Sequence, residues 1–206
     1  MDGVADGDGL ALGVERLADH VDSPPEGLAR ERLWQVRAGK VILAAGNGSA
    51  ALGADVGLDI PVGPERGHII VTERTRPLFN HVLGQVRQTD EGTVMLGATK
   101  ESVGFDTGFN PAMIQKVANN AVRKIPALKG LRMIRSWSAL RIMSPDGFPV
   151  YQESDENPGA YSISCHSGVT LAAAHAMSLA PRLLQPGFND HYAAFSPRRF
   201  DVPKTD

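Results

Sequence analysis

The residues best suited to hold a ligand form a short polar corner, Cys165–His166–Ser167–Gly168, between two apolar segments. The flanking patterns predict a strand over 161–164 and a long, charge-poor helix over 169–184 that we expect to be buried. A helix that starts directly after a glycine turn leaves its first amides unpaired, with the positive end of the helix dipole behind them. Such a corner favours an electron-rich ligand, and a rigid helix is a good place to hold a cofactor. An ordinary strand-to-helix connection is the open alternative.

A second group of glycines follows an apolar run over 40–46, which predicts a buried parallel strand. Gly46–Asn47–Gly48–Ser49–Ala50–Ala51 satisfies the G-x-G-x-x-A pattern of a dinucleotide-binding turn, and Glu73 ends a later strand as that pattern requires. The helix predicted from Ser49 has room for only about two turns before Gly57, which is short for a crossover helix. We therefore discount a pyrophosphate loop here. An NAD-binding domain stays a weaker alternative, which titration with NADH would test.

Composition and charge exclude several classes of function. The chain has 206 residues, enough for one sizeable core or two small ones, and a formal net charge of −2 with both signs interspersed. Nothing in this balance indicates a nucleic-acid or membrane partner, and no segment has the pattern of a membrane span or an export signal, so a soluble cytoplasmic protein is the default expectation. The single cysteine excludes an internal disulfide and a cysteine-ligated cluster held by this chain alone. The six histidines are scattered without the spacing of metal ligands, so we expect no metal site.

Between the two candidate ligand segments, the pattern changes from buried apolar runs to hairpins and one amphipathic helix. The glycine of Asp90–Glu91–Gly92 stands where a three-residue hairpin turn needs a positive φ. The predicted elements are, in order, a strand over 68–73, hairpin strands over 85–89 and 93–97, a helix from Asn110–Pro111 to Pro126, and a strand over 131–143. The first 39 residues have a weak pattern, with one candidate strand over 33–37. We therefore expect an antiparallel module between two pieces of an α/β layer.

Six segments together carry a resemblance to known proteins. They are, in order, Val41–Gly46, Arg66–Glu73, Arg87–Gly97, Gly104–Asp106, Trp137–Pro149 and Cys165–Ala172. The set resembles one family of FAD enzymes, which contains glycine oxidase, sarcosine oxidase and D-amino-acid dehydrogenase and is known as the D-amino-acid oxidase (DAO) family. Within it, the sequence is most similar to the FAD subunits of D-hydroxyproline dehydrogenase and opine oxidase. Each segment alone is weak, but the ordered set is specific.

The resemblance implies the C-terminal part of a two-domain flavoenzyme. Residues 1–63 and 145–190 would be the remainder of a Rossmann-like FAD-binding domain, 64–144 an antiparallel-sheet substrate domain covered by helices, and 191–206 a C-terminal tail. Family members open with a strand and a G-x-G-x-x-G turn for the FAD pyrophosphate, followed by an acidic residue for the ribose. This chain shows neither, so we expect the N-terminal dinucleotide-binding half to be missing and the enzyme to be truncated or split.

The resemblance also assigns candidate catalytic residues. Arg141 matches the family's carboxylate-binding arginine, whose planar guanidinium would hold the substrate so that its Cα hydrogen faces flavin N5. The alternative is a structural arginine that pairs with its sheet neighbours. Arg87 and His68 are second candidates for the substrate pocket, and His68 could equally be a structural strand histidine. Trp137 and Phe148 are assigned to packing.

For the cofactor, the family shows a similar small-residue corner, so His166, Ser167 and the Gly168–Val169–Thr170 amides are expected to hold the N1 and C2 carbonyl edge of the flavin. Ala45 and Gly46 would lie beside FAD at the end of their strand. Cys165 is expected to be a packing residue and not a nucleophile, and no cysteine matches the covalent attachment seen in sarcosine oxidases, so FAD would be noncovalent. We expect the corner and Arg141 to converge on one concavity.

Two functions from different classes stay open. The first is an oxidoreductase that oxidises the C–N bond of an amino acid or secondary amine, of the D-amino-acid, hydroxyproline, sarcosine, glycine or opine type, by hydride transfer to flavin N5. The second is a non-catalytic fragment or assembly subunit that cannot bind FAD alone. The expected partners are a small amino acid or amine, and a partner subunit or separate N-terminal half. The electron acceptor is open, and exposed core surface would favour a homo-oligomer.

Overall fold

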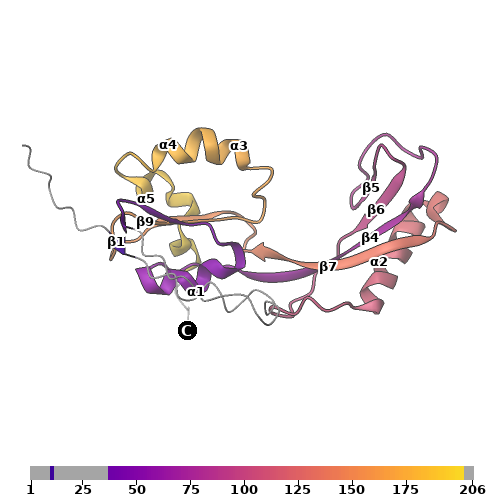
Figure 1. Cartoon of the computed structure of the whole chain (residues 1–206), viewed down its shortest axis with the longest axis horizontal. Coiled ribbons are helices and arrows are strands. Elements are labelled where there is room, and N and C mark those ends of the chain that lie inside the picture. The colour runs from indigo at the N-terminus through magenta and orange to yellow at the C-terminus, as the bar shows by residue number, and fades with distance from the viewer. Residues whose placement is uncertain (1–9, 12–36, 202–206) are drawn as a thin grey trace, which may run out of the picture. The chain divides into compact units, whose positions relative to one another are not determined.

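The computed structural model describes residues 10–11 and 37–201 (Figure 1). These residues form two compact units. Unit 1 comprises the described residues up to Pro61 and those from Pro149 onward, and unit 2 comprises Val62–Phe148. One sheet with a parallel pair and one antiparallel sheet confirm the mixed fold class predicted from the sequence. The candidate strand over 33–37 lies outside the described residues except for its last position.

Unit 1 is built on a three-stranded sheet with the order β3-β9-β8. β3 (Val41–Leu43) runs parallel to β9 (Ala160–Ser164), and β8 (Val150–Glu153) runs antiparallel to β9. The pairing aligns Leu43 with Ser162, so the carboxyl ends of β3 and β9 lie at the same edge of the sheet. The strands predicted over 40–46 and 161–164 are confirmed, but the predicted burial of the first is wrong at Ile42, which is 44% exposed. β8 is an additional strand that the sequence analysis missed.

The core of unit 1 is largely aromatic. Tyr151, Tyr161, Leu179 and Phe188 are buried together, and Phe195 packs against them. Phe195 belongs to the stretch over 191–206 that the sequence analysis assigns to a C-terminal tail, and the described residues of this stretch lie in unit 1. The remaining elements of unit 1 are β1 (Leu10–Ala11), β2 (Arg37–Ala38), η1 (Gly46–Gly48), α1 (Ser49–Gly53), η2 (Ala54–Val56), α5 (Phe188–His191), η5 (Ala193–Phe195) and η6 (Pro197–Phe200).

The segment predicted as one buried helix over 169–184 forms short helical pieces in a row (Figure 1). They are α3 (Ala172–Ala174), the π-helical turn η4 (His175–Leu179) and α4 (Ala180–Arg182). The helical prediction is confirmed in part, but the prediction of burial is wrong, because Val169 is 95% exposed and Met177 79% exposed. A helix that is apolar on all sides packs one stripe against its own sheet, and its other sides need a cover that the described residues do not supply.

Unit 2 is an antiparallel sheet with the order β5-β6-β4-β7, and one helix covers one of its faces. Its elements are β4 (Gly63–Arg74), β5 (Val86–Gln88), β6 (Thr93–Gly97), α2 (Pro111–Lys124), η3 (Pro126–Leu128) and β7 (Met133–Met143). The hairpin of β5 and β6 turns at Gly92, whose φ of 91° lies in the left-handed region that favours glycine. The predicted hairpin is therefore confirmed.

Helix α2 begins and ends where the sequence predicts. The Asn110 side chain accepts a hydrogen bond from the Ala112 amide at 3.1 Å, and Pro111 occupies the first helical position. Pro126 follows directly after Ile125, the C-cap residue of α2. The helix covers the sheet because its apolar stripe packs against apolar strand residues; the buried members of this core are Ile70, Val86, Val94, Leu96, Ile114, Ala121 and Leu128.

The two faces of the unit 2 sheet carry different residues, because side chains alternate along a strand. Ile70 packs in the core beneath α2, and His68, two positions earlier on β4, shares that face. Glu65 and Gly67 lie on the opposite face. Glu65 is aligned with Arg141 of β7 and bonded to it, so Arg141 also lies on the face opposite α2.

The two aromatic residues assigned to packing differ in burial. Trp137 is half-buried, and the Arg135 guanidinium carbon lies 5.4 Å from its ring centroid. Phe148 is 63% exposed, so the assignment of Phe148 to packing is wrong. A short turn, Ser144–Gly147, sets Phe148 at the surface as the chain leaves β7. Within the described part of the chain, no helix is long and apolar enough to cross a membrane.

Candidate functional site

The structure brings the predicted cofactor residues together at one edge of the unit 1 sheet. Ala45 and Gly46 follow β3, and the corner from Cys165 to Thr170 follows β9. Because the two strands are parallel neighbours, both segments leave the same edge of the sheet. Gly46 has a φ of 61°, which turns the chain sharply into η1. The carboxyl edge of parallel strands is where open α/β sheets bind ligands.

The corner presents backbone amides to its surroundings. The first backbone hydrogen bond of the helical segment runs from the Leu171 amide to the Ser167 carbonyl at 2.9 Å. The amides of Gly168, Val169 and Thr170 make no hydrogen bond to any residue that the structure describes, and all three residues are exposed. These amides carry partial positive charge at the start of a helical segment. The corner can therefore donate hydrogen bonds to an electron-rich group.

The side chains around the corner are not arranged for nucleophilic chemistry. Cys165 is half-buried, and burial raises the pKa of its thiol, so it stays protonated at neutral pH. His166 is exposed, and its Nδ1 lies 3.2 Å from Ser167 Oγ. The sequence-based expectation that Cys165 is not a nucleophile agrees with this environment. What the corner offers is a set of donors and no carboxylate.

A tyrosine–histidine pair links the helical segment to the unit 1 core. Tyr151 Oη lies 2.6 Å from His175 Nε2, and the two rings meet edge to face. Burial raises the pKa of Tyr151 to about 12, so its hydroxyl stays protonated. This contact fixes one side of the π-helical turn to β8. No local pattern indicated this pair, since β8 itself was missed.

In unit 2, Arg141 is held by one end of its guanidinium. Its Nη1 donates to Glu65 Oε1 at 2.6 Å and to the Thr99 carbonyl at 3.1 Å. The side chain is 23% exposed. Neither Nε nor Nη2 makes a hydrogen bond to a described residue. Two parallel N–H donors are therefore left on one edge, which is the geometry that binds a carboxylate bidentately.

Gly67 makes room for this arginine. A Cβ at position 67 would lie 2.1 Å from Arg141 Nη2 and 3.1 Å from the Thr99 carbonyl oxygen. The guanidinium thus lies over the bare backbone of β4, where any side chain would displace it. Glu65, Gly67 and Thr99 are the positioning residues that the sequence analysis missed. Their roles depend on strand register and on a loop carbonyl, which no local pattern reveals.

His68 lies on the other face and is fully buried. Its Nε2 accepts a hydrogen bond from the Asn110 amide at 3.1 Å, so the ring proton sits on Nδ1. Nδ1 lies 3.0 Å from both Thr99 Oγ1 and Glu101 Oε2. Both ring nitrogens are thus bonded inside the protein, which favours the structural alternative for His68 and leaves it no atom for a substrate.

The neighbouring Arg66 completes this buried polar network. Its side chain is 6% exposed and pairs with Glu101 at 3.0 Å and with Asp106 at 2.7 Å. The hydrogen bond from Arg66 holds the pKa of the Glu101 carboxyl below its usual range. The Asn110 amide side chain donates to the same carboxylate at 2.8 Å. The network fastens the loop over 101–110 to β4 and keeps Thr99 beside Arg141.

Arg87 does not join Arg141. It lies on the outer strand β5, in the row that passes through Met95 and Val71 of the neighbouring strands. Val71 and Glu65 are six positions apart on β4, which separates the two arginines by about 20 Å along the strands. Arg87 instead lines a hollow of about 650 Å³ among the loops before β5 and after it, with Phe79 and His81.

The predicted residues thus form two groups, the cofactor corner in unit 1 and Arg141 with its partners in unit 2. Their convergence on one concavity stays a prediction. Among residues 10–11 and 37–201, no three His, Cys, Asp or Glu side chains gather in a way that could hold a metal ion.

Comparison with known proteins places these features in a family. A family model described as FAD dependent oxidoreductase (DAO) matches residues 9–182. One subunit of the opine oxidase of Rhizobium meliloti is 36% identical over 167 residues, which cover 81% of this chain and 45% of that protein. The HcnC subunit of the hydrogen cyanide synthase of Pseudomonas protegens is 34% identical over 140 residues, covering 65% of this chain and 34% of that protein.

The fold agrees with this match. Glycine oxidase from Geobacillus kaustophilus superposes with a TM-score of 0.69 at 24% identity, over 79% of this chain and 46% of that one. The chain therefore spans less than half the length of these relatives. Since the family model covers most of the sequence, from residue 9 to residue 182, the chain belongs to the DAO family of FAD-dependent oxidoreductases.

Proposed function

We propose that this chain forms part of an FAD-dependent oxidoreductase that oxidises the C–N bond of an amino acid or secondary amine carrying a carboxylate. The observation that supports this most is the free guanidinium edge of Arg141, held over Gly67 by Glu65 and Thr99. Relatives named as an opine oxidase subunit and as glycine oxidase support the substrate class. Among the substrates considered, an opine or a small amino acid fits this support best.

In this proposal the residues of unit 2 bind and orient the substrate. The Nε and Nη2 donors of Arg141 hold the carboxylate, which fixes the direction of the Cα–H bond. Glu65 and the Thr99 carbonyl hold Nη1, so the guanidinium loses little freedom when the substrate binds. No strong protein base is required, because a neutral amine already carries the electron pair that assists loss of hydride. Arg87 would lie outside this pocket.

The residues of unit 1 fit the electron-rich edge of a flavin. The unpaired amides of Gly168, Val169 and Thr170 would donate to it, and Ala45 and Gly46 would pack beside it at the same sheet edge. FAD, when bound there, supplies the acceptor for the hydride. Cys165 is the single cysteine of the chain, and it is half-buried. This favours noncovalent FAD.

A partner is part of the proposal. Two relatives are named as subunits, of opine oxidase and of hydrogen cyanide synthase, so we propose that this chain works with a further subunit or with the remaining half of a family member. The second candidate function, a non-catalytic assembly subunit, is supported by the exposure of Val169 and Met177 on the helical segment. Such an apolar surface suits a chain that needs a partner before it binds FAD.

Substitution of Arg141 tests the catalytic proposal. In the FAD-loaded protein, Arg141→Leu should raise KM for an amino acid by roughly 30-fold to 5,000-fold, which corresponds to the ~2–5 kcal/mol that loss of one partner of a hydrogen-bonded charge pair costs. The KM for the corresponding amino-acid amide should change little. Arg135→Leu is the matched control, because Arg135 lies on the same strand and face. An unchanged KM for the amino acid in Arg141→Leu would remove Arg141 from the substrate site. A separate observation tests the alternative function. If the chain stays colourless with added FAD and with a co-expressed N-terminal half, the assembly subunit is favoured.

A further inference from the structure

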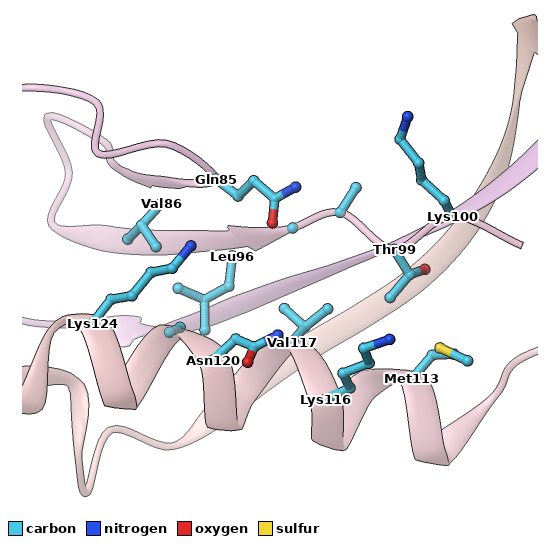
Figure 2. A pocket seen from close by; sticks show the side chains of 13 residues that line it. Gln85, Val86, Leu96, Thr99, Lys100, Met113, Lys116, Val117, Asn120 and Lys124 are labelled. Carbon is cyan, nitrogen blue, oxygen red and sulfur yellow. The ribbon is translucent and has the colours of Figure 1, made fainter.

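We propose that unit 2 contains a second binding site, for a small organic anion with an apolar body and two anionic groups. The site is a hollow of about 250 Å³ between α2 and the end of β6 with the loop over 97–100 (Figure 2). It lies on the α2 face of the sheet, and Arg141 lies on the opposite face. The hollow and the carboxylate site proposed for the substrate therefore lie on opposite faces, and Thr99 belongs to both, since it lines the hollow and its carbonyl holds Arg141.

The floor of the hollow is apolar. Val86, Leu96 and Ala121 are each at most 5% exposed, and they belong to the core of unit 2. Val117 and Met113 of α2 continue this surface toward the loop (Figure 2). A ligand that lies here removes apolar surface from water on both itself and the floor, which is favourable in proportion to the area covered. A fully hydrated ion alone would not use this floor.

The rim of the hollow is positively charged. Lys100 comes from the loop after β6, and Lys116 and Lys124 come from α2. On the helix, Lys116, Asn120 and Lys124 follow one another at intervals of four residues, so they form one stripe along the hollow. Figure 2 shows Lys124 at the end near Val86, with Lys100 and Lys116 toward the other end. Positive charge therefore stands at both ends of the apolar floor.

Nothing in the described structure neutralises this charge. No aspartate or glutamate lines the hollow, and α2 itself has no acidic residue. None of the three lysines has an ion pair with a carboxylate of residues 37–201, whereas Arg66, Arg132, Arg141 and Arg198 all do. Amide groups of Gln85 and Asn120 add polar contacts at the rim. An anion would lower the mutual repulsion of the lysines, and a cation would raise it.

The spacing of the lysines favours two anionic groups over one. Lys116 and Lys124 are eight residues apart on the helix, which separates their Cα atoms by about 12 Å. A single carboxylate can approach only one end of the hollow at a time. A ligand with a rigid apolar body and a carboxylate or phosphate at each end can reach Lys124 and the Lys100–Lys116 end together, while its body covers Val117 and Leu96.

The test uses benzene-1,3-dicarboxylate as the probe and the full chain, with binding followed through the methyl NMR signals of Val117 and Leu96. We expect saturable shifts, weaker binding of benzoate, and much weaker binding of the neutral benzene-1,3-dicarboxamide. Raising the ionic strength tenfold should weaken binding of the dicarboxylate several-fold, because exposed ion pairs are screened by salt. Inorganic phosphate, which has charge but no apolar body, should bind more weakly than the dicarboxylate.

Charge-removing variants make the test specific. Replacing Lys100, Lys116 and Lys124 together by glutamine should weaken binding of the dicarboxylate at least about tenfold. Lys129→Gln, an exposed lysine beyond the end of α2, is the matched control and should leave binding unchanged. Three results would each overturn the proposal. The first is equal affinity for the diamide and the dicarboxylate, and the second is tighter binding of phosphate than of the dicarboxylate. The third is unchanged affinity for the dicarboxylate in a triple variant whose melting temperature is unaltered.

Discussion

The close fit of Arg141 over Gly67 predicts a large effect for a single added methyl group. In Gly67→Ala, the new Cβ would stand 2.1 Å from Nη2, whereas ordinary contact begins at 3.4 Å. The guanidinium must therefore move by about 1.3 Å, the difference between these two distances. Because Nη2 is the far end of a flexible side chain that is 23% exposed, the side chain and not the sheet should give way.

Misplacing a positioning group by about 1 Å can cost roughly 100-fold in rate. Two factors of ten correspond to about 2.7 kcal/mol of transition-state binding. We therefore expect kcat/KM for a carboxylate substrate to fall about 100-fold in the FAD-loaded protein. The melting temperature should change little, because an alanine in an extended strand introduces no backbone strain. A shift of the Arg141 Nε–H NMR signal in the chain would show the displacement without an activity assay.

A double-mutant cycle decides whether the effect passes through Arg141. If it does, Gly67→Ala should cost nothing further in an Arg141→Leu background. Gly63→Ala is the matched control, since a Cβ at position 63 of the same strand would meet no atom within 4 Å. The reasoning fails if Gly67→Ala keeps wild-type kcat/KM, or if it costs the same factor with Arg141 absent.

Three further predictions concern the rest of the structure. Arg66 lowers the pKa of Glu101 in the folded state. The stability that the ionised carboxylate contributes is therefore present above about pH 4.3 and is lost as the pH falls through the lowered pKa. Acid titration of Trp137 fluorescence in a Trp34→Phe background should show this loss, and Glu101→Gln should flatten the dependence of stability on pH. Ile70→Ala removes a side chain that is 2% exposed and packed in the core beneath α2. It should lower the free energy of unfolding of unit 2 by about 2–5 kcal/mol, measured in denaturant melts with the same fluorescence signal. A smaller change would mean that this core is loosely packed. Tyr151 should ionise near pH 12 in an ultraviolet titration, and Tyr151→Phe should remove that component; a phenol that titrates at the ordinary value would contradict its burial.

The local elements of the fold could be predicted because their signals are local. Asn110 and Pro111 mark the start of α2, and Gly92 marks the hairpin turn, since each residue type has a direct backbone role at its position. Burial of the helical segment after Val169 could not be predicted in the same way. Apolar residues on all sides indicate that a surface needs a cover, but they do not say which other segment supplies it.

The sequence proposes residue types for the candidate site but does not predict which residues contact one another. Arg141 is a candidate by resemblance, and its pairing with Glu65 depends on the register of two strands that are far apart in sequence. The Thr99 carbonyl that holds it comes from a loop with no sequence signature. His68 was ambiguous because a strand histidine can face either side, and only the contacts with Thr99 and Asn110 favour a structural role.

The two ends of unit 2 have a consequence for experimental work. Gly63 at the start of β4 and Met143 at the end of β7 are paired residues of one antiparallel ladder, so the chain enters and leaves this unit at neighbouring points, about 5 Å apart. Insertions with adjacent ends can be exchanged between proteins without stretching either host or guest. Transplanting this module between family members is therefore a direct way to ask which half of such a flavoenzyme sets its substrate preference.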